Sequence, residues 1–156
     1  MNYIFLDVDG VLNNTKHYSK QHKNYGGRYW CEEMPFNPRS LKNLRKIIDK
    51  TNAKIVLSSS WRRSDACKIV LFARLKEYGI KIHSETPYTS GKRGIEIKEW
   101  CKENLKENDK ILIIDDEMYD ILEHYTNDKI VKLNDRDGLT FWKTREAIKK
   151  LNDKNK

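Results

Sequence analysis

Cysteine, histidine and long apolar segments are scarce in this chain of 156 residues. Its three cysteines form no CxxC pair and its four histidines show no metal-ligand spacing, so no zinc site is expected. No apolar run is long enough to span a bilayer and no export signal is visible. We therefore expect no membrane contact, a reducing cytoplasmic compartment, no disulfide-linked partner, and free thiols at Cys31, Cys67 and Cys101.

The rest of the composition is that of a globular protein with a positive net charge. A hydrophobic fraction of 38% and four tryptophans argue against disorder, and the length suits one domain with a core. We predict a single domain over residues 1–156, with a frayed tail at 152–156. The formal net charge of +8 favours acidic partners, although lysine-rich surfaces also serve solubility.

Acidic residues are absent between Asp9 and Glu32, within a stretch at about 13–36 that we predict to be an irregular insertion. Its cations alternate with aromatic residues, a pattern that suits a phosphate backbone and stacked bases. The candidate substrate-binding cations are Lys16, Lys20 and Lys23. A solvated surface loop explains the same composition equally well.

Strand-like apolar runs alternate with helical patterns along the chain. This alternation predicts a mainly parallel, Rossmann-like sheet covered on both faces, a three-layer α/β/α sandwich. Strands are predicted at 3–8, 54–57, 80–83, 111–114 and 129–133. Helices are predicted after the capping residues Asn37, Ser64 and Thr140 and after 91–94, with a further helical face at Met118, Ile121, Leu122 and Tyr125.

Polar clusters recur where these predicted strands end. In chain order they are Asp7 with Asp9, Ser58 with its neighbours, Lys92 with Arg93, and Asp115 with Asp116. The carboxyl ends of neighbouring parallel strands meet at one sheet edge, so we expect the clusters to converge. Together they supply oxygen ligands for Mg²⁺, a hydroxyl for a phosphate oxygen and a fixed cation, the parts that phosphoryl transfer needs. There is no P-loop, and Gly10 is misplaced for an EF-hand.

Three of these segments resemble motifs of the haloacid dehalogenase (HAD) superfamily. Residues 5–11, Phe-Leu-Asp-Val-Asp-Gly-Val, resemble its first motif, and 55–58 and 113–116 resemble its second and fourth motifs in the same order. The resemblance covers residues 2–150. The segments at 58–62, 93–97 and 138–140 look closer to the small HAD domains of RNA-repair proteins, and phage-type polynucleotide 3′-phosphatase domains look similar. The resemblance implies a HAD-type phosphatase.

The resemblance also implies roles for individual residues. Asp7 would attack phosphorus and form an aspartyl-phosphate. Asp9 would be the general acid for the leaving oxygen and then the base for water. Mg²⁺ would lie between Asp7, the backbone carbonyl of Asp9 and Asp115, with Asp116 binding directly or through water. Ser58 would donate a hydrogen bond to the phosphate.

The cation of the third motif has two candidates. We prefer Lys92 as the catalytic cation over Arg93, which stays a candidate substrate contact; both also fit a simple helix start. Ser59 and Arg62 are further candidate substrate contacts, and Arg62 fits a surface ion pair with Asp65 equally well. Outside the site, we expect core positions for Trp61 and Trp100 and a helix-surface position for Asp120.

Substrate size follows from the lengths of the insertions. In the HAD superfamily, insertions over the site select the substrate, and neither interval here has room for a large cap. A site under a small flap is open, which suits a nucleic-acid end. We therefore predict a Mg²⁺-dependent phosphatase acting on a terminal phosphate of DNA or RNA, with the 3′ end favoured. A small-molecule nucleotidase is the runner-up, and the oligomeric state is open.

Two rival functions use the same fold or the same residue types. A nucleic-acid-binding protein with an idle HAD site would account for the charge, but it gives no physical reason to hold four acids together. A phospho-receiver domain also uses acids, a hydroxyl and a lysine. Its phosphoacceptor aspartate ends a middle strand, however, where this chain has Ser58.

Overall fold

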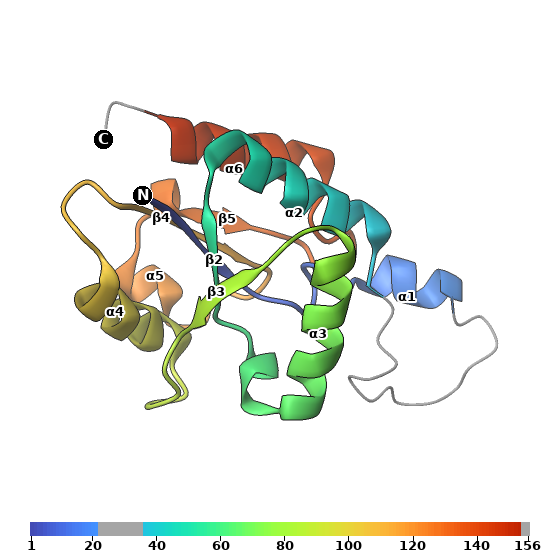
Figure 1. The fold of residues 1–156 in the computed structure, drawn as a ribbon, viewed down its shortest axis with the longest axis horizontal. Helices are drawn as coiled ribbons and strands as arrows, with labels where there is room; N and C mark the ends of the chain where they lie inside the picture. The colour runs from blue at the N-terminus through green and yellow to red at the C-terminus, as the bar shows by residue number, and fades with distance from the viewer. Residues whose placement is uncertain (22–35, 154–156) are drawn as a thin grey trace.

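Five parallel strands form one sheet in the order β3-β2-β1-β4-β5 (Figure 1). The computed structural model describes residues 1–21 and 36–153. The strands are β1 (Asn2–Leu6), β2 (Lys54–Leu57), β3 (Ile82–Glu85), β4 (Lys110–Asp115) and β5 (Ile130–Lys132). The all-parallel sheet confirms the fold predicted from the alternation of strands and helices.

Side chains of the central strand alternate between two cores, because successive residues of a strand point to opposite faces. Ile4 and Leu6 belong to one buried cluster, and Tyr3 and Phe5 belong to the other. A strand that is buried on both faces reads as a continuous apolar run, as β1 does.

Helices cover both faces of the sheet. The cluster around Ile4 and Leu6 receives side chains from α2 (Pro38–Thr51), α3 (Asp65–Glu77) and α6 (Phe141–Asn152). The cluster around Tyr3 and Phe5 receives side chains from α4 (Arg93–Asn104) and α5 (Ile121–His124). Figure 1 shows α2 and α6 side by side over one face, with α4 and α5 away from them. The three-layer arrangement is therefore confirmed.

The predicted capping residues begin their helices. The side chains of Asn37, Ser64 and Thr140 accept hydrogen bonds from backbone N–H groups in the first turns of α2, α3 and α6. The third strand begins two residues later than predicted. Its first predicted residue, Ile80, closes the end of α3 by donating its N–H to the Leu75 carbonyl, beside Gly79 at φ 67°.

Two segments differ from the sequence prediction in secondary structure. Part of the stretch predicted to be irregular is the helix α1 (Thr15–Gln21), which begins where the Asn14 side chain accepts a hydrogen bond from His17 N. Lys23 lies outside the described residues. The face predicted around 118–125 is reduced to the one-turn α5, where Ile121 is buried but Leu122 is 54% exposed. Two short 3₁₀ helices, η2 (Ser60–Arg63) and η3 (Asn127–Lys129), complete the described elements.

The cysteines do not all match the prediction of free thiols. Cys101 is free, whereas Cys67 is disulfide-bonded, so the prediction is wrong for Cys67. This bond could not be predicted, because residue spacing along the chain does not reveal which thiols the fold brings together. Cys31 lies outside the described residues. Among the described helices, none has the length and apolar character to cross a membrane.

Candidate active site

Three carboxylates meet at the carboxyl edge of the central strands. Asp7 follows β1 directly and Asp115 ends β4; the two strands pair in register up to Leu6 and Ile114. Asp7 and Asp115 are therefore neighbours, and both are buried. Oxygen atoms of Asp7, Asp115 and the half-buried Asp116 all lie within 4.8 Å of one another. The predicted convergence of the first and fourth motifs is thus observed.

Burial makes this group of acids hard to ionise. It raises the pKa of Asp7 from 3.8 to about 7, and the charge of Asp115 adds to the effect. Burial and the neighbouring Asp115 likewise raise the pKa of Asp116 to about 6. Burial also raises the pKa of Asp115. All three carboxylates can be ionised at the same time only if a cation close to them offsets their mutual repulsion.

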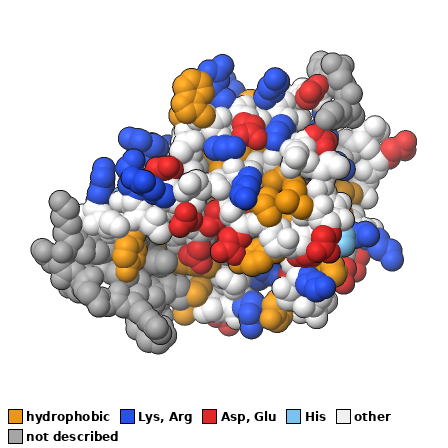
Figure 2. All heavy atoms as spheres, turned by 180° about the vertical axis from the view of Figure 1, so that it is seen from behind, with side chains coloured by type: hydrophobic (Ala, Val, Ile, Leu, Met, Phe, Trp, Pro, Cys, Tyr) orange, Lys and Arg blue, Asp and Glu red, His pale blue; other side chains and the backbone are white. Residues whose placement is uncertain are grey.

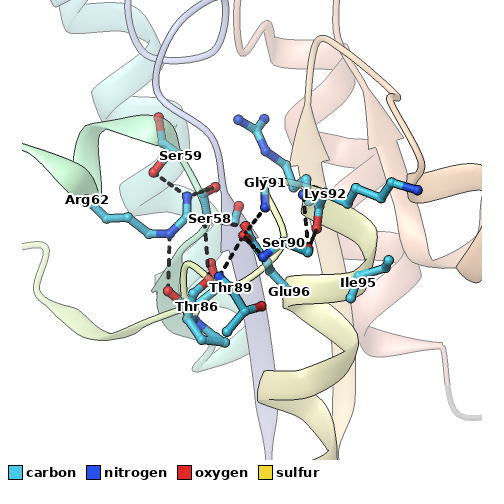
Figure 3. Close-up of polar contacts among 12 residues, drawn as sticks. Ser58, Ser59, Arg62, Thr86, Thr89, Ser90, Gly91, Lys92, Ile95 and Glu96 are labelled. Atoms are coloured by element: carbon cyan, nitrogen blue, oxygen red, sulfur yellow. Dashed lines mark hydrogen bonds and ion pairs between the residues drawn. The ribbon is translucent and has the colours of Figure 1, made fainter.

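Arg93 supplies a positive charge to these acids. It is the first residue of α4, and its Nη1 lies 3.1 Å from Asp7 Oδ1 and 2.5 Å from Asp115 Oδ2. The two carboxylates raise the pKa of Arg93, against the opposing effect of burial. Lys92 is exposed, and in Figure 3 its side chain extends away from Ser58 and Arg62. The structure thus brings Arg93, rather than the preferred Lys92, to the carboxylates.

The Asp9 carboxylate is held by two side-chain donors. Its Oδ1 accepts a hydrogen bond of 2.8 Å from Asn13 Nδ2, and its Oδ2 accepts one of 2.9 Å from Trp61 Nε1. Trp61 and Trp100 lie in the two cores, as predicted. Sequence reasoning gave Trp61 only a packing role and overlooked Asn13. The nearness of Asn13 to Asp9 in the chain was the one available signal.

Gly10 allows Asp116 to approach the first motif. Its φ is 70°, and a Cβ added there would lie 2.3 Å from Asp116 Oδ2. Only glycine adopts this backbone conformation without cost and leaves room for the carboxylate. The position of Asp116 therefore requires a glycine at residue 10.

Ser58 and Ser59 line the acidic group from the end of β2. Ser58 is fully buried, its N–H donates to the Leu6 carbonyl, and its Oγ has no hydrogen-bond partner among the described residues. An unpaired buried hydroxyl is costly, so this one is suited to a ligand oxygen. The Ser59 hydroxyl accepts a hydrogen bond from Trp61 N, and the interaction of Ser59 with the Asp7 carboxylate opposes the rise of the Asp7 pKa.

Arg62 ties the loop after β2 to the loop before α4 (Figure 3). Its guanidinium is buried and directs all five N–H groups at protein acceptors. These acceptors are the carbonyls of Ser58, Ser59, Thr86 and Pro87 and the carboxylate of Glu96. The other oxygen of Glu96 accepts hydrogen bonds from the N–H groups of 89–91. This network favours a positioning role for Arg62 over the substrate contact or the Asp65 pair considered from the sequence.

Asp120 fixes the start of the helix that carries Arg93. Its two carboxylate oxygens accept hydrogen bonds of 3.0 Å from the N–H groups of Gly94 and Ile95. Asp120 is 8% exposed, so its predicted place on a helix surface is wrong. A carboxylate at a helix N-terminus satisfies donors that have no partner within the helix. No local pattern reveals this contact, because its partners lie 25 residues away or more.

The model of the HAD domain in Swiss Army Knife RNA repair proteins matches residues 3–142. The chain belongs to this family. No curated protein and no solved structure matches the chain. The matched range contains β1 from its second residue, the other four strands and every acid of the site.

The acidic group of this HAD domain fits a hard divalent cation. Asp7, Asp115 and Asp116 offer oxygen donors only, and no histidine or cysteine belongs to the group that the described residues form. Oxygen ligands of this kind suit Mg²⁺ rather than Zn²⁺. The Asp9 side chain is not part of this group, and the backbone-carbonyl contact expected for Asp9 stays a prediction.

Two of the three predicted substrate cations of the insertion, Lys16 and Lys20, lie on α1. Lys16 and Lys20 are exposed and line a groove of about 550 Å³ with Arg39 and Trp142. Lys16 Nζ also lies 3.6 Å from the exposed Asp137. Figure 2 shows basic side chains gathered at the end of the molecule that carries α1, beside a group of acidic ones. The groove keeps these lysines available as candidate contacts for an anionic strand.

Proposed function

We propose that this HAD domain is a Mg²⁺-dependent phosphohydrolase that removes a terminal phosphate from RNA or DNA through an aspartyl-phosphate on Asp7. The observation that carries the proposal is the meeting of three carboxylates and Arg93 beside the unpaired hydroxyl of Ser58. Carboxylates alone would repel a phosphate. A cation among them, next to a hydrogen-bond donor, is what a phosphate monoester needs in order to bind.

The proposed chemistry has two steps at one phosphorus atom. An Asp7 oxygen attacks phosphorus while the ester P–O bond breaks, and Asp9 gives its proton to the leaving oxygen. Asp9 then takes a proton from water, which attacks the same phosphorus, releases inorganic phosphate and restores Asp7. Trp61 and Asn13 keep the Asp9 carboxylate in one orientation for both transfers.

Binding of the transferred phosphate is assigned to the surrounding residues. Ser58 donates its hydroxyl to a phosphate oxygen, and Arg93 balances the charge of the phosphate and of Asp7. Arg93 replaces Lys92 as the proposed catalytic cation because it lies at the carboxylates. Mg²⁺ held by Asp7, Asp115 and Asp116 would supply Lewis-acid neutralisation of the nucleophile and the phosphate.

The nucleic-acid part of the proposal is supported by the family and by the basic groove. The family consists of HAD domains in RNA repair proteins, and Lys16 and Lys20 line a groove on the insertion. The 3′ end is favoured by the motif-level resemblance to polynucleotide 3′-phosphatase domains. Changing Lys16, Lys20 and Lys23 to glutamate should weaken action on oligonucleotides and flatten its salt dependence. Equal losses on a small aryl phosphate would contradict a strand-binding role.

A substrate panel tests the proposal. The purified protein is incubated with Mg²⁺ and with RNA and DNA oligonucleotides phosphorylated at the 3′ or the 5′ end, and with mononucleotides. Asp7→Asn should release no phosphate, while Asp49→Asn, an exposed acid that pairs with Arg45, should match the wild type. Release from one oligonucleotide end supports the proposal and names the end. Release from mononucleotides alone would make the protein a nucleotidase, and no release from any substrate would contradict the proposal.

A further inference from the structure

A cleft of about 210 Å³ opens beside the proposed nucleophile. Three loops build it, those that follow β2, β3 and β4, and they contribute Arg63, Tyr88 and Tyr119. Arg93 lines the same cleft while its Nη1 lies 3.1 Å from Asp7 Oδ1. Whatever occupies the cleft is therefore one side chain away from the reacting centre.

Two tyrosine rings face solvent in this cleft. Tyr88 is 55% exposed and Tyr119 is 64% exposed. Both rings are anchored: Arg63 Cζ lies 4.1 Å from the Tyr88 centroid, and Arg93 Cζ lies 5.3 Å from the Tyr119 centroid. Exposed aromatic rings held in place are suited to stacking on a planar ligand, because little conformational entropy is lost when the ligand binds.

The backbone holds Tyr119 in a conformation that a tyrosine rarely adopts. Its φ is 37°, in the left-handed region, and such residues persist where surrounding contacts fix them. Here the next residue, Asp120, caps α4 through Gly94 and Ile95, and the Arg93 guanidinium lies over the Tyr119 ring. The loop after β4 therefore holds the Tyr119 ring at the cleft although the backbone there is strained.

The charges of the cleft favour an anion that extends beyond one phosphate. Arg62 and Glu96 line it but form a buried ion pair with each other. The remaining charged residues of the lining are Arg93, at the carboxylates, and the exposed Arg63. In addition to Arg93, an exposed arginine next to an aromatic ring matches a phosphodiester that follows a base.

We propose that this cleft binds the terminal nucleoside of a single-stranded RNA substrate. Its base stacks on Tyr119 and Tyr88, and Arg63 pairs with the next phosphodiester. The inference rests on the proposed phosphatase function and adds to it the recognition of a base, which a general phosphomonoesterase does not need. The cleft thereby distinguishes a nucleotide end from a sugar phosphate.

The test compares two RNA oligonucleotides that carry the same 3′-phosphate and differ only in whether the terminal residue has a base. Their affinities for Asp7→Asn, which does not turn over, are measured by fluorescence anisotropy. Loss of one stacked base should weaken binding about tenfold. Adding Tyr119→Ala or Tyr88→Ala should bring the two affinities close together, whereas Tyr119→Phe should keep the difference.

Phe72→Ala is the matched control, because it removes another exposed aromatic ring, 39% exposed, that lines neither this cleft nor the basic groove. Equal affinity for the two RNAs in the Asp7→Asn protein would overturn the inference, as would a preference that disappears only in Phe72→Ala. Retention of the preference in both tyrosine-to-alanine variants would also overturn it.

Hydrolysis by the wild type separates this inference from the proposed function. If neither RNA loses phosphate but the base-bearing one still binds more tightly, the phosphatase proposal fails and the cleft assignment stands. If both RNAs lose phosphate with the same kcat/KM, the phosphatase proposal stands and the cleft assignment fails.

Discussion

Replacing Glu96 with alanine should unfold the protein more easily and disturb the site from a distance. Glu96 is buried, pairs with the buried Arg62, and accepts hydrogen bonds from the N–H groups of 89–91. Removing one partner of a buried pair leaves an uncompensated charge and typically costs about 3–5 kcal/mol. The freed N–H groups can reach water because their loop is near the surface, so they should add little. For a chain of this length the melting temperature should fall by about 10 °C.

Urea unfolding of three variants measures this effect. Glu96→Gln keeps a hydrogen-bond acceptor for the loop but loses the charge. It should therefore lower the free energy of unfolding by less than Glu96→Ala does. Glu99→Ala is the matched control one turn along α4, because the contact of Glu99 within the described part of the chain is an exposed hydrogen bond from Thr89 Oγ1. Its cost should stay below about 1 kcal/mol. A Glu96→Ala protein as stable as Glu99→Ala would refute the account of this network.

Three further predictions concern the acids themselves. Gly10→Ala should reduce Mg²⁺ affinity measured by calorimetry, because the added Cβ would displace Asp116; Gly91→Ala, with the same φ but 3.9 Å of space, should not. Trp61→Phe keeps the ring in the core but removes the donor to the acid/base carboxylate, so kcat should fall about tenfold with little change in melting temperature; an unchanged kcat would contradict that role. The folded state raises the pKa of Asp7 from 3.8 to about 7, so it binds this proton more tightly than the unfolded state does. The stability gained in this way is present below pH 4 and lost as pH rises to 7. Without metal, the melting temperature of the wild type should therefore fall relative to Asp7→Asn over that range, and parallel profiles would count against it.

The predictable parts of the fold are those that depend on neighbours in the chain. β2 has the predicted bounds, and Asn37, Ser64 and Thr140 cap the predicted helices. Apolar runs that end in Asp7 and in Asp115 identified the two strands that meet at the site. Because the carboxyl ends of neighbouring parallel strands lie at one edge of the sheet, the acidic group could be predicted from the sequence.

The unpredicted parts depend on contacts across the fold. Whether Lys92 or Arg93 faces the acids is set by the phase of α4, since consecutive helical residues point about 100° apart. The helix α1 has little apolar periodicity and depends on a local cap from Asn14. Glu96 and Arg62 are ordinary charged residues in the sequence, and only the meeting of two loops makes them a buried pair.

The central claim is that Asp7 becomes phosphorylated during turnover. The most direct measurement is to mix the wild type with Mg²⁺ and a 3′-phosphorylated RNA, quench with acid within one turnover, and locate phosphate by mass spectrometry of peptides. We predict phosphate on the peptide that contains Asp7, and none in Asp7→Asn. Phosphate released at full rate by the wild type, with another residue labelled or with Asp7→Asn still active, would contradict the account.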